Sequence, residues 1–400
     1  MSTQVTNYQC PACTGPLHFV GASGKLECDY CGTTYDVAEI EAFYAAKDAQ
    51  AVEASKEAEA KEAEKQAELA AQEDTEAAGV AGAVGSEGTE GSPESQWDTS
   101  NLGTDWGADA AKMKVYNCPS CGAELICDET TAATSCPYCG NPSIVPGQFA
   151  GALKPDYVLP FKLSKEDAKA ALKKHYAKKP LLPKTFSNAN HIEEIKGVYV
   201  PFWMFDAEAE GTVNFEATRS FVHRSGGYEI VDTDHFNVLR AGDIAFEKVP
   251  VDASSKMPDD YMDSIEPYDY SELKPFSTAY LPGFMADKYD VTVEDCYERA
   301  DTRCKGSFVS ALKETVVGYQ TCSASQTDIN LKRGEVHYAL IPVWLLTTKW
   351  NNQNFLFAMN GQTGKFVGKL PSSLGKAAGI FAAIAGAISA IGVAALLLLW

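Results

Sequence analysis

Positive charge is scarce in this chain. Its 400 residues include 34 lysines and arginines against 54 aspartates and glutamates, which gives a formal net charge of −20 at pH 7. Such a surface repels the phosphate backbone of nucleic acids over most of its area, which argues against a general nucleic-acid-binding protein. The length and a hydrophobic content of 45% leave room for roughly two or three folded domains with connectors.

The sequence also lacks the short motifs of several enzyme classes. It contains no P-loop, no GxSxG, no HExxH and no dinucleotide-binding fingerprint, so we expect no enzyme. Residues Met1–Asn7 are mostly polar and uncharged, and we therefore expect no signal peptide. A long apolar run is found only at 377–400, where 24 residues carry no charge. A helix of that length crosses a bilayer core of about 30 Å, so this run is predicted to be a transmembrane helix.

The lysines before this run and the small residues within it predict its orientation in the membrane and its packing. Lys365, Lys369 and Lys376 precede it, and the positive-inside rule then keeps the N-terminal bulk in the cytoplasm of a single-pass protein of the cell membrane. A stripe of small residues recurs at every fourth position, which lets another membrane helix approach closely. We expect this stripe to pack on a partner helix or on a second copy of the chain; it comprises Ala378, Ala382, Gly386, Ala390 and Ala394.

Eight of the 12 cysteines form two quartets with identical C-x2-C-x14-C-x2-C spacing. Two CxxC knuckles at this separation are typical of a zinc ribbon, in which four thiolates surround one structural Zn²⁺. A redox CxxC motif occurs singly beside a βαβ pattern, so the repeated quartet favours zinc, with iron or a cluster as the alternative. Two Zn²⁺ are therefore predicted, one held by Cys10, Cys13, Cys28 and Cys31 and the other by Cys118, Cys121, Cys136 and Cys139.

The charge of the ribbons favours protein partners over nucleic acid. From Tyr116 to Leu153 there is no lysine or arginine, whereas phosphate contacts come chiefly from these two residues. The alternative is a membrane-tethered zinc-ribbon protein that binds nucleic acid. The segment Lys154–Lys184 is different, since its nine lysines and three acids either form a solvated face or contact anionic lipid or the acidic connector.

We predict a multidomain α+β protein. Between Glu39 and Glu94, 15 carboxylates and 4 lysines indicate a solvated connector. Just beyond this stretch, Trp97 and Trp106 either dock on a folded domain or mark a partner-binding motif. The segments are zinc ribbon one (1–38), an acidic helical spacer (39–79), a flexible linker (80–112), zinc ribbon two (113–147), a mixed α/β juxtamembrane domain (148–372) and the transmembrane helix (377–400).

The mixed domain is expected to contain helices and paired strands. A capping box at Ser164–Asp167 predicts a helix that ends before Pro180, and a second helix is predicted at Val293–Val317. Trp203 with Ala217 and Trp344 with Ala358 have equal separations. Turn residues within both stretches (Glu210-Gly211 and Asn351-Asn352) predict duplicated β-hairpins in one sheet system. Cys127, Cys296, Cys304 and Cys322 lack metal spacing and are expected to be small core residues.

Several stretches resemble bacterial zinc-ribbon membrane proteins of the YdjG type, also called TFIIB-type. They are DETTAATSCPYCGNP (128–142), KGVYVPFW (196–203), SSKMPDD (254–260), PVWLLTTKW and FAMNGQTGKFVG. The resemblance covers most of the chain from Lys114 onward. It implies a membrane-anchored adaptor of phage-shock (envelope-stress) machinery, with phage-shock protein A-like and SPFH-like partners. It also implies that the eight ribbon cysteines are zinc ligands, and it carries over no catalytic residue.

Overall fold

In a computed structural model of the chain, the structure describes residues 10–13, 17–21, 23–28, 31–44, 46, 96–103, 106, 109–110, 113–128, 131, 135–142, 144–147, 153–177, 179–183, 186, 195–350 and 353–399. The chain divides into two compact units. The first comprises Met1–His18 and Lys25–Gln96, and the second comprises Phe19–Gly24 and Trp97–Trp400. Most of the predicted acidic spacer (39–79) and of the predicted linker (80–112) lies outside the described residues.

Ribbon one is built on short strands. β1 (Leu17–Val20), β2 (Lys25–Cys28) and β3 (Thr34–Tyr35) form a sheet in that order, with Leu26 of β2 opposite Tyr35 of β3. Residues 37–44 are helical, and Ile40 among them is buried. Strands of two to four residues bury too little apolar surface to hold a fold by themselves, so a cross-link between the knuckles is needed here.

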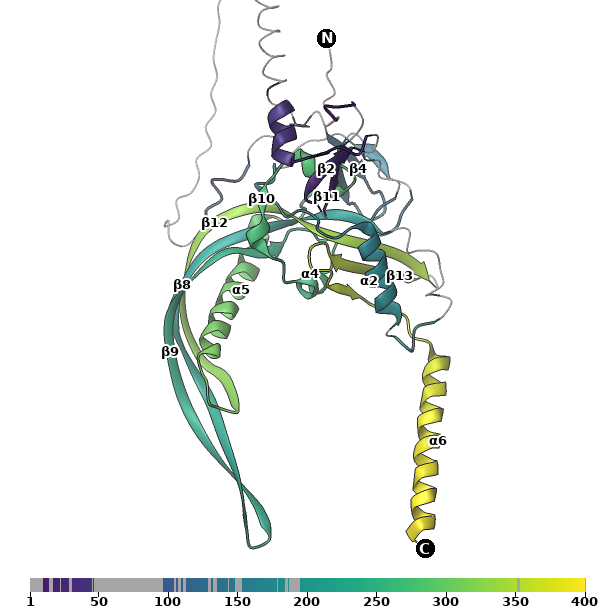
Figure 1. The fold of residues 1–400 in the computed structure, drawn as a ribbon. Coiled ribbons are helices and arrows are strands. Elements are labelled where there is room, and N and C mark those ends of the chain that lie inside the picture. Colours follow the sequence, from purple (N-terminus) through teal and green to yellow (C-terminus); the bar gives the residue numbers. More distant parts are fainter. Residues whose placement is uncertain are drawn as a thin grey trace, which may run out of the picture. The chain divides into compact units, whose positions relative to one another are not determined.

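Three long strands dominate the second unit. β8 (Lys196–Ser225) is central and pairs antiparallel with β9 (Tyr228–Asp252) on one edge and with β12 (Thr321–Trp350) on the other. We call their outer parts, residues 207–246 and 321–333, the arm. Figure 1 shows the three strands curving together, with α5 (Val293–Glu314) along the concave side.

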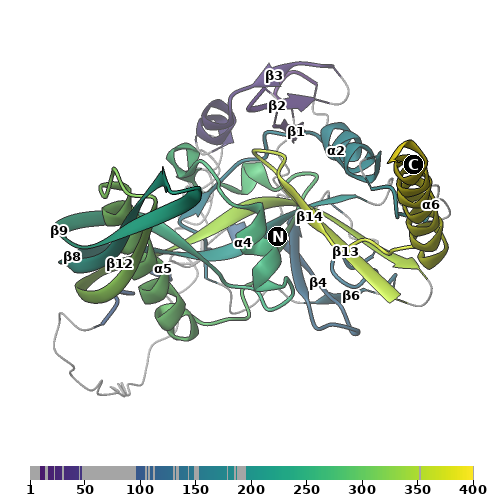
Figure 2. The same cartoon turned by 90° about the horizontal axis from the view of Figure 1, so that it is seen from below.

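The amphipathic pattern of α5 explains its position. Thr292 and Asp295 form a capping box at its start, and residues on one helix face are buried. In the arm, successive side chains of β8 alternate between buried and more exposed, as expected of a strand with one covered face. Figure 2 shows α5 lying across β8, β9 and β12. The helix ends at Glu314, three residues before the predicted Val317, where the Thr315 hydroxyl donates to the Leu312 carbonyl at 2.6 Å.

The first predicted hairpin is wrong. Glu210 and Gly211, expected to form its turn, lie in the middle of β8, which continues to Ser225 and turns at Gly226-Gly227. A Cβ atom at Gly211 would stand 2.2 Å from the carbonyl oxygen of Asp328 on β12. The glycine therefore permits a close approach of two backbones inside the sheet, which composition alone does not distinguish from a turn.

The second predicted hairpin, unlike the first, does correspond to two paired strands. β12 pairs antiparallel with β13 (Gln353–Asn360), with Trp350 opposite Gln353 and Leu345 opposite Ala358. The predicted turn Asn351-Asn352 lies outside the described residues. Trp344 and Ala358 thus lie on two paired strands, whereas Trp203 and Ala217 share one strand, and the two stretches are not copies of one hairpin.

A short strand joins ribbon two to the sheet of the arm. In β11 (Met285–Asp287), Ala286 lies opposite Tyr199 of β8 in parallel and opposite Ile126 of β5 antiparallel. β5 (Glu124–Asp128) pairs with β4 (Met113–Asn117), which pairs with β6 (Val145–Gly147). Among the described residues, the strands of ribbon two are therefore part of the same 11-stranded sheet as β8 and β12.

Smaller elements complete the second unit. α2 (Lys165–Ala177) begins at the predicted cap, where the Ser164 hydroxyl donates to the Asp167 carboxylate at 2.7 Å. α2 packs on β14 (Phe366–Gly368), which pairs with β13. The other described elements are β7 (Tyr157–Val158), α4 (Asp259–Ile265), β10 (Lys274–Pro275) and two 3₁₀ turns, η3 (Tyr270–Glu272) and η4 (Thr278–Tyr280).

Both tryptophans of the predicted linker are docked on the second unit. Trp97 is 4% exposed, and its ring centroid lies 4.7 Å from that of Phe205. Trp106 is 5% exposed, and its ring centroid lies 5.6 Å from that of Phe276. Asp98 adds a backbone bridge to the base of the arm, because its carbonyl accepts from the Val336 amide at 2.9 Å. Of the two alternatives for these tryptophans, docking is the one that the structure shows.

The apolar run forms α6 (Leu374–Leu399). Its segment Leu374–Ala394 is long and apolar enough to cross a membrane, and none of it is buried inside the protein. The exposed side chains include Phe381, Ile384 and Ile388, which in water would leave a continuous apolar helix surface.

Candidate metal centres

Three of the four CxxC knuckles share one backbone turn. In each, the N–H of the glycine after the second cysteine donates to the carbonyl of the first cysteine at 2.9 to 3.1 Å. These glycines adopt φ angles of 68°, 71° and 72°, a left-handed conformation that favours glycine. The turn brings both thiols of a knuckle to one side, as chelation requires. The three bonds run from Gly32 to Cys28, from Gly122 to Cys118 and from Gly140 to Cys136.

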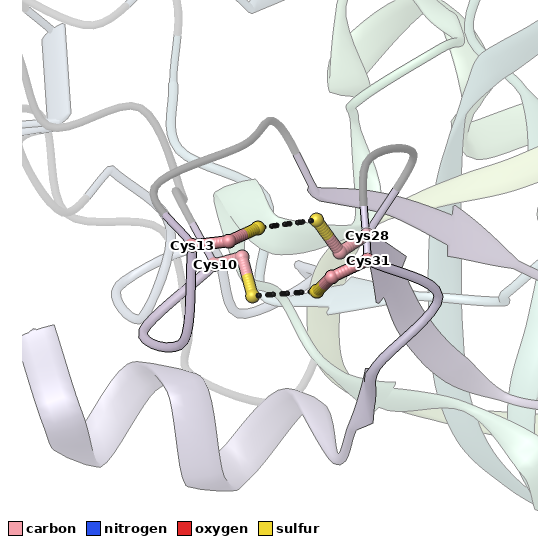
Figure 3. A group of neighbouring side chains, drawn as sticks. All are labelled: Cys10, Cys13, Cys28 and Cys31. Carbon is pink, nitrogen blue, oxygen red and sulfur yellow. Dashed lines mark hydrogen bonds between the residues drawn. The ribbon is translucent and has the colours of Figure 1, made fainter.

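The four thiols of ribbon one lie together (Figure 3). Cys10 Sγ is 3.5 Å from Cys31 Sγ, Cys13 Sγ is 3.4 Å from Cys28 Sγ, and all four sulfurs lie within 4.8 Å of one another. Sulfurs bound tetrahedrally at about 2.3 Å from one zinc ion stand about 3.8 Å apart, whereas a disulfide requires about 2.05 Å. The spacing therefore fits four ligands of a single tetrahedral metal ion.

Ribbon two repeats this arrangement. Cys118 Sγ is 3.6 Å from Cys139 Sγ, and Cys121 Sγ is 3.6 Å from Cys136 Sγ. As in ribbon one, the first cysteine lies beside the fourth and the second beside the third. The structure thus brings the eight predicted cysteines into two groups of four, each of which could hold a metal ion.

The thiols differ in how readily they ionise. A hydrogen bond with the Thr33 side chain, supported by its backbone, lowers the pKa of Cys31 to about 6. Burial opposes ionisation of Cys118, but the backbone N–H groups of Cys121 and Ser120 outweigh it and lower the pKa to about 7. Burial raises the pKa of Cys121 to about 11 and that of Cys136 further. Ribbon two thus combines one thiol that ionises readily, Cys118, with two whose ionisation burial opposes, Cys121 and Cys136, and a divalent cation bound by all of them would displace their protons.

The second knuckle of ribbon two is tied to the sheet by polar contacts. The Tyr138 hydroxyl donates to Asp287 Oδ2 on β11 at 2.8 Å. The Thr347 hydroxyl on β12 donates to the carbonyls of Pro137 and Tyr138 at 2.6 and 2.9 Å. Lys196 at the start of β8 donates to the Ser135 carbonyl at 2.6 Å. Three strands of the sheet therefore hold this knuckle in place.

Sequence analysis missed two buried carboxyl groups beside ribbon two. Asp287 is 1% exposed, and its Oδ2 also accepts from the Ser254 hydroxyl at 2.6 Å. Asp252 is 4% exposed, and its Oδ1 accepts from the Ser254 amide at 3.1 Å. Burial raises the pKa of Asp252 to about 8 and that of Asp287 to about 7. The one signal in the sequence was the SSKMPDD stretch, whose Ser254 links both carboxyls.

The other predicted residues occupy the core and the apolar helix. Cys127, Cys296 and Cys304 are buried, as expected of small core residues, whereas Cys322 is half-buried. The small-residue stripe of Ala378, Ala382, Gly386, Ala390 and Ala394 lies along α6, and its packing on a partner stays a prediction.

A protein of similar sequence shows the family of this chain. The chain is 38% identical to the protein YdjG of Bacillus subtilis (strain 168), itself described as uncharacterized, over 320 residues that cover 68% of this chain and 94% of YdjG. The chain belongs to the YdjG family. No family model matches it, and no solved structure does. The match takes in nearly all of YdjG and about two thirds of this chain.

Proposed function

We propose that this YdjG-family protein is a membrane-anchored adaptor with two structural zinc ribbons, which recruits protein partners at the cytoplasmic face of the cell membrane. One observation carries the proposal: the chain combines two groups of four cysteines, an apolar terminal helix and a long arm that ends in exposed apolar side chains. Together these features supply metal-stabilised small folds, an anchor and a surface for a partner.

Zinc is the metal that the donor set favours. Four thiolates at tetrahedral spacing suit Zn²⁺, and four protein ligands close its coordination shell. A closed shell leaves no position for water or substrate, so both ions would have a structural role. The short strands of ribbon one, two to four residues each, are the kind of unit that depends on such an ion.

Membrane anchoring is supported by α6 and its charges. The helix offers a span of 21 residues, and Lys365, Lys369 and Lys376 lie just before or within its first turn. Basic residues at the end of a span are retained in the cytoplasm, and this rule supports a cytoplasmic position for the arm and both ribbons of a single-pass protein.

The end of the arm supports binding of a protein partner. β12 begins at Thr321, opposite Thr218. Beyond this point β8 and β9 continue as a two-stranded β-hairpin, residues 219–234, which we call the arm tip. Paired residues share a face, so apolar side chains occupy both faces of the tip. Exposed apolar patches of this kind mark interaction sites. The side chains are Phe221, Val222, Tyr228, Ile230 and Val231, each at least 39% exposed.

The cellular setting comes from the resemblance alone. Stretches such as SSKMPDD resemble YdjG-type proteins, and that resemblance implies a link to the phage-shock machinery. We therefore propose a role in the envelope-stress response, with phage-shock protein A-like and SPFH-like proteins as partners.

Co-purification from membranes tests the adaptor. The full-length protein is extracted in detergent and the proteins that accompany it are identified, for the wild type, for the arm-tip variant F221S/I230S/V231S and for the control E216Q/D243N, which changes exposed polar residues elsewhere on the arm. We expect the same partners with the wild type and the control, and at least about ten-fold less of them with the tip variant, the ratio that a loss of about 1.4 kcal/mol in binding gives. Equal recovery from all three would contradict a role of the tip in the adaptor function.

The second candidate is a tethered nucleic-acid-binding protein. Detergent-solubilised full-length protein is mixed with single- and double-stranded probes, and binding is measured as a function of salt. An adaptor should show at most the weak salt dependence of the few exposed lysines that follow Lys169, whereas roughly six to ten phosphate contacts would weaken binding by roughly 10³–10⁵ between 50 and 200 mM salt. Such a dependence would put nucleic-acid binding first.

A further inference from the structure

The segment that follows α2 (Lys165–Ala177) is hydrogen-bonded to the start of α6, although the two segments are far apart in sequence. The Ser373 amide donates to the Leu181 carbonyl at 2.9 Å, and Lys376 Nζ donates to the Leu182 carbonyl at 2.6 Å. The Leu182 amide in turn donates to the Lys179 carbonyl at 3.1 Å. Both views show α2 near the beginning of α6 (Figures 1 and 2). The segment directly after α2 is therefore held where the chain enters the proposed membrane span.

Packing determines which face of α2 is exposed at this place. Ala168 and Leu172 are buried, and the His175 ring centroid lies 4.8 Å from that of Phe366 on β14. The opposite face carries Lys173 and Lys174, which are exposed, and Lys179 beyond the helix end is exposed as well. The packing of α2 thus exposes Lys173 and Lys174, and Lys179 is exposed in the segment that is bonded to α6.

Within α2 the acidic residues are confined to the first turn. The acids of α2 are Glu166 and Asp167 in its first turn, and Asp167 is engaged in the cap with Ser164. At 1.5 Å per residue they lie about 10 Å along the axis from Lys174. No ion pair joins Lys173, Lys174 or Lys179 to any residue that the structure describes. The helix dipole favours a lysine in the last turn, which explains Lys174. It does not explain Lys179, which lies beyond the helix.

We propose that Lys173, Lys174 and Lys179 bind the headgroups of anionic phospholipids in the cytoplasmic leaflet around α6. The proposal rests on the membrane anchoring proposed above. A lysine close to an anionic bilayer surface gains about 1 kcal/mol, which is roughly five-fold in occupancy. Three lysines held by the fold at one end of a helix add their contributions without the entropy cost of ordering a flexible tail. α2 would then set the height of the second unit above the bilayer.

Amine labelling of the full-length protein tests this surface without any mutation. The protein is reconstituted in nanodiscs of phosphatidylcholine alone, or of phosphatidylcholine with an equal amount of phosphatidylglycerol. An acetylating reagent is added, and the labelling rate of each lysine is read by peptide mass spectrometry. Lys305 and Lys313, exposed on α5, serve as internal controls. A third sample, phosphatidylcholine discs with free glycerol phosphate, distinguishes a membrane headgroup from a soluble phosphate.

We expect labelling of Lys173, Lys174 and Lys179 to slow about five-fold in the phosphatidylglycerol discs and to recover at high salt, with the controls unchanged. Equal rates in both kinds of disc would overturn the lipid site while leaving the anchor intact. Protection by free glycerol phosphate alone would also overturn it, in favour of a soluble ligand. A chain that stays outside the discs would overturn the anchor and the lipid site together.

Discussion

The two ribbons have the same cysteine spacing and nearly the same sulfur geometry, but their surroundings differ. Ribbon one rests on strands of two to four residues, and Cys13 and Cys31 are exposed. Ribbon two belongs to an 11-stranded sheet, and its corresponding Cys121 and Cys139 are half-buried against an apolar cluster that includes residues of β8 and β12. Identical spacing thus produces the same cage for a metal, while the neighbouring sheet decides how far the loss of that metal would spread.

Removing one ligand from each ribbon tests this difference most severely. We expect C136S to unfold β4–β6 and to expose the edge of β11, because structural zinc contributes on the order of 10–16 kcal/mol to such units. The matched variant C28S should lose one zinc ion while β8, β9 and β12 keep their native hydrogen-exchange protection. Zinc content per chain and exchange by mass spectrometry read both outcomes. If C28S and C136S lose protection in β8 equally, the two ribbons are not independent.

The carboxyls buried beside ribbon two predict a pH dependence of the stability of the second unit, and ribbon one has no counterpart among its described residues. The pKa values of about 8 for Asp252 and about 7 for Asp287 exceed the unfolded value of 3.8, so the folded state retains protons that the unfolded state loses. This contribution is fully present below about pH 4 and is lost as pH rises through 7 and 8, by on the order of 4 kcal/mol per carboxyl. Burial is the main cause for Asp252; Asp259 and Asp287 also raise its pKa, and Arg299 lowers it.

Thermal unfolding between about pH 6 and pH 9 measures the upper part of this loss, about 1.4 kcal/mol for each pH unit below the pKa of each carboxyl, while zinc remains bound. The melting temperature of the second unit should fall with rising pH in the wild type and change much less in D252N, which cannot ionise. Among its described residues ribbon one has no buried carboxyl, so the stability of ribbon one should not fall with rising pH for this reason. A wild-type melting temperature that rises across this range would show that the carboxyls are ionised in the fold.

Chelation should remove the two ions in order. The exposed Cys13 and Cys31 make ribbon one open locally more easily than ribbon two, whose knuckle is tied to three strands. We expect zinc release in two phases, with the faster at least about ten-fold faster, the ratio that about 1.4 kcal/mol of opening free energy gives. A colorimetric chelator follows the phases, and C28S should abolish the faster one. A single phase for the wild type would contradict a difference in local opening between the two ribbons.

The smallest effect is expected from matched glycine substitutions. Gly32 and Gly140 have φ angles of 68° and 72°, and no atom lies closer than 3.6 Å to a Cβ placed at either. G32A and G140A should therefore cost about 1 kcal/mol each, purely as backbone strain, and weaken zinc about five-fold at their own sites. Metal competition should find equal losses, while the melting temperature of the second unit falls only in G140A. Unequal losses of affinity would mean that the local turns are not equivalent.

Features that depend on neighbours in sequence were predicted well. The CxxC spacing indicated both groups of four thiols, the pattern at Ser164–Asp167 indicated the start of α2, and the uncharged run indicated α6. Gly211 was misjudged because a glycine in a strand pattern has two explanations, and only the packing of β12 on β8 distinguishes them. The choice between docking and a partner motif for Trp97 likewise depended on Phe205, far along the chain.

Local sequence is enough to specify the two metal cages, because chelation by a knuckle depends on residues three positions apart and on a glycine that tolerates a positive φ. The membership of one cage in the sheet of the arm comes instead from tertiary packing. The contact between Tyr138 and Asp287 spans 149 positions, and the pairing of β5 with β11 leaves no periodic trace in either segment. Strand pairing over such separations depends on which edges meet in the folded chain, and a buried carboxyl acquires its raised pKa only once burial has removed its water.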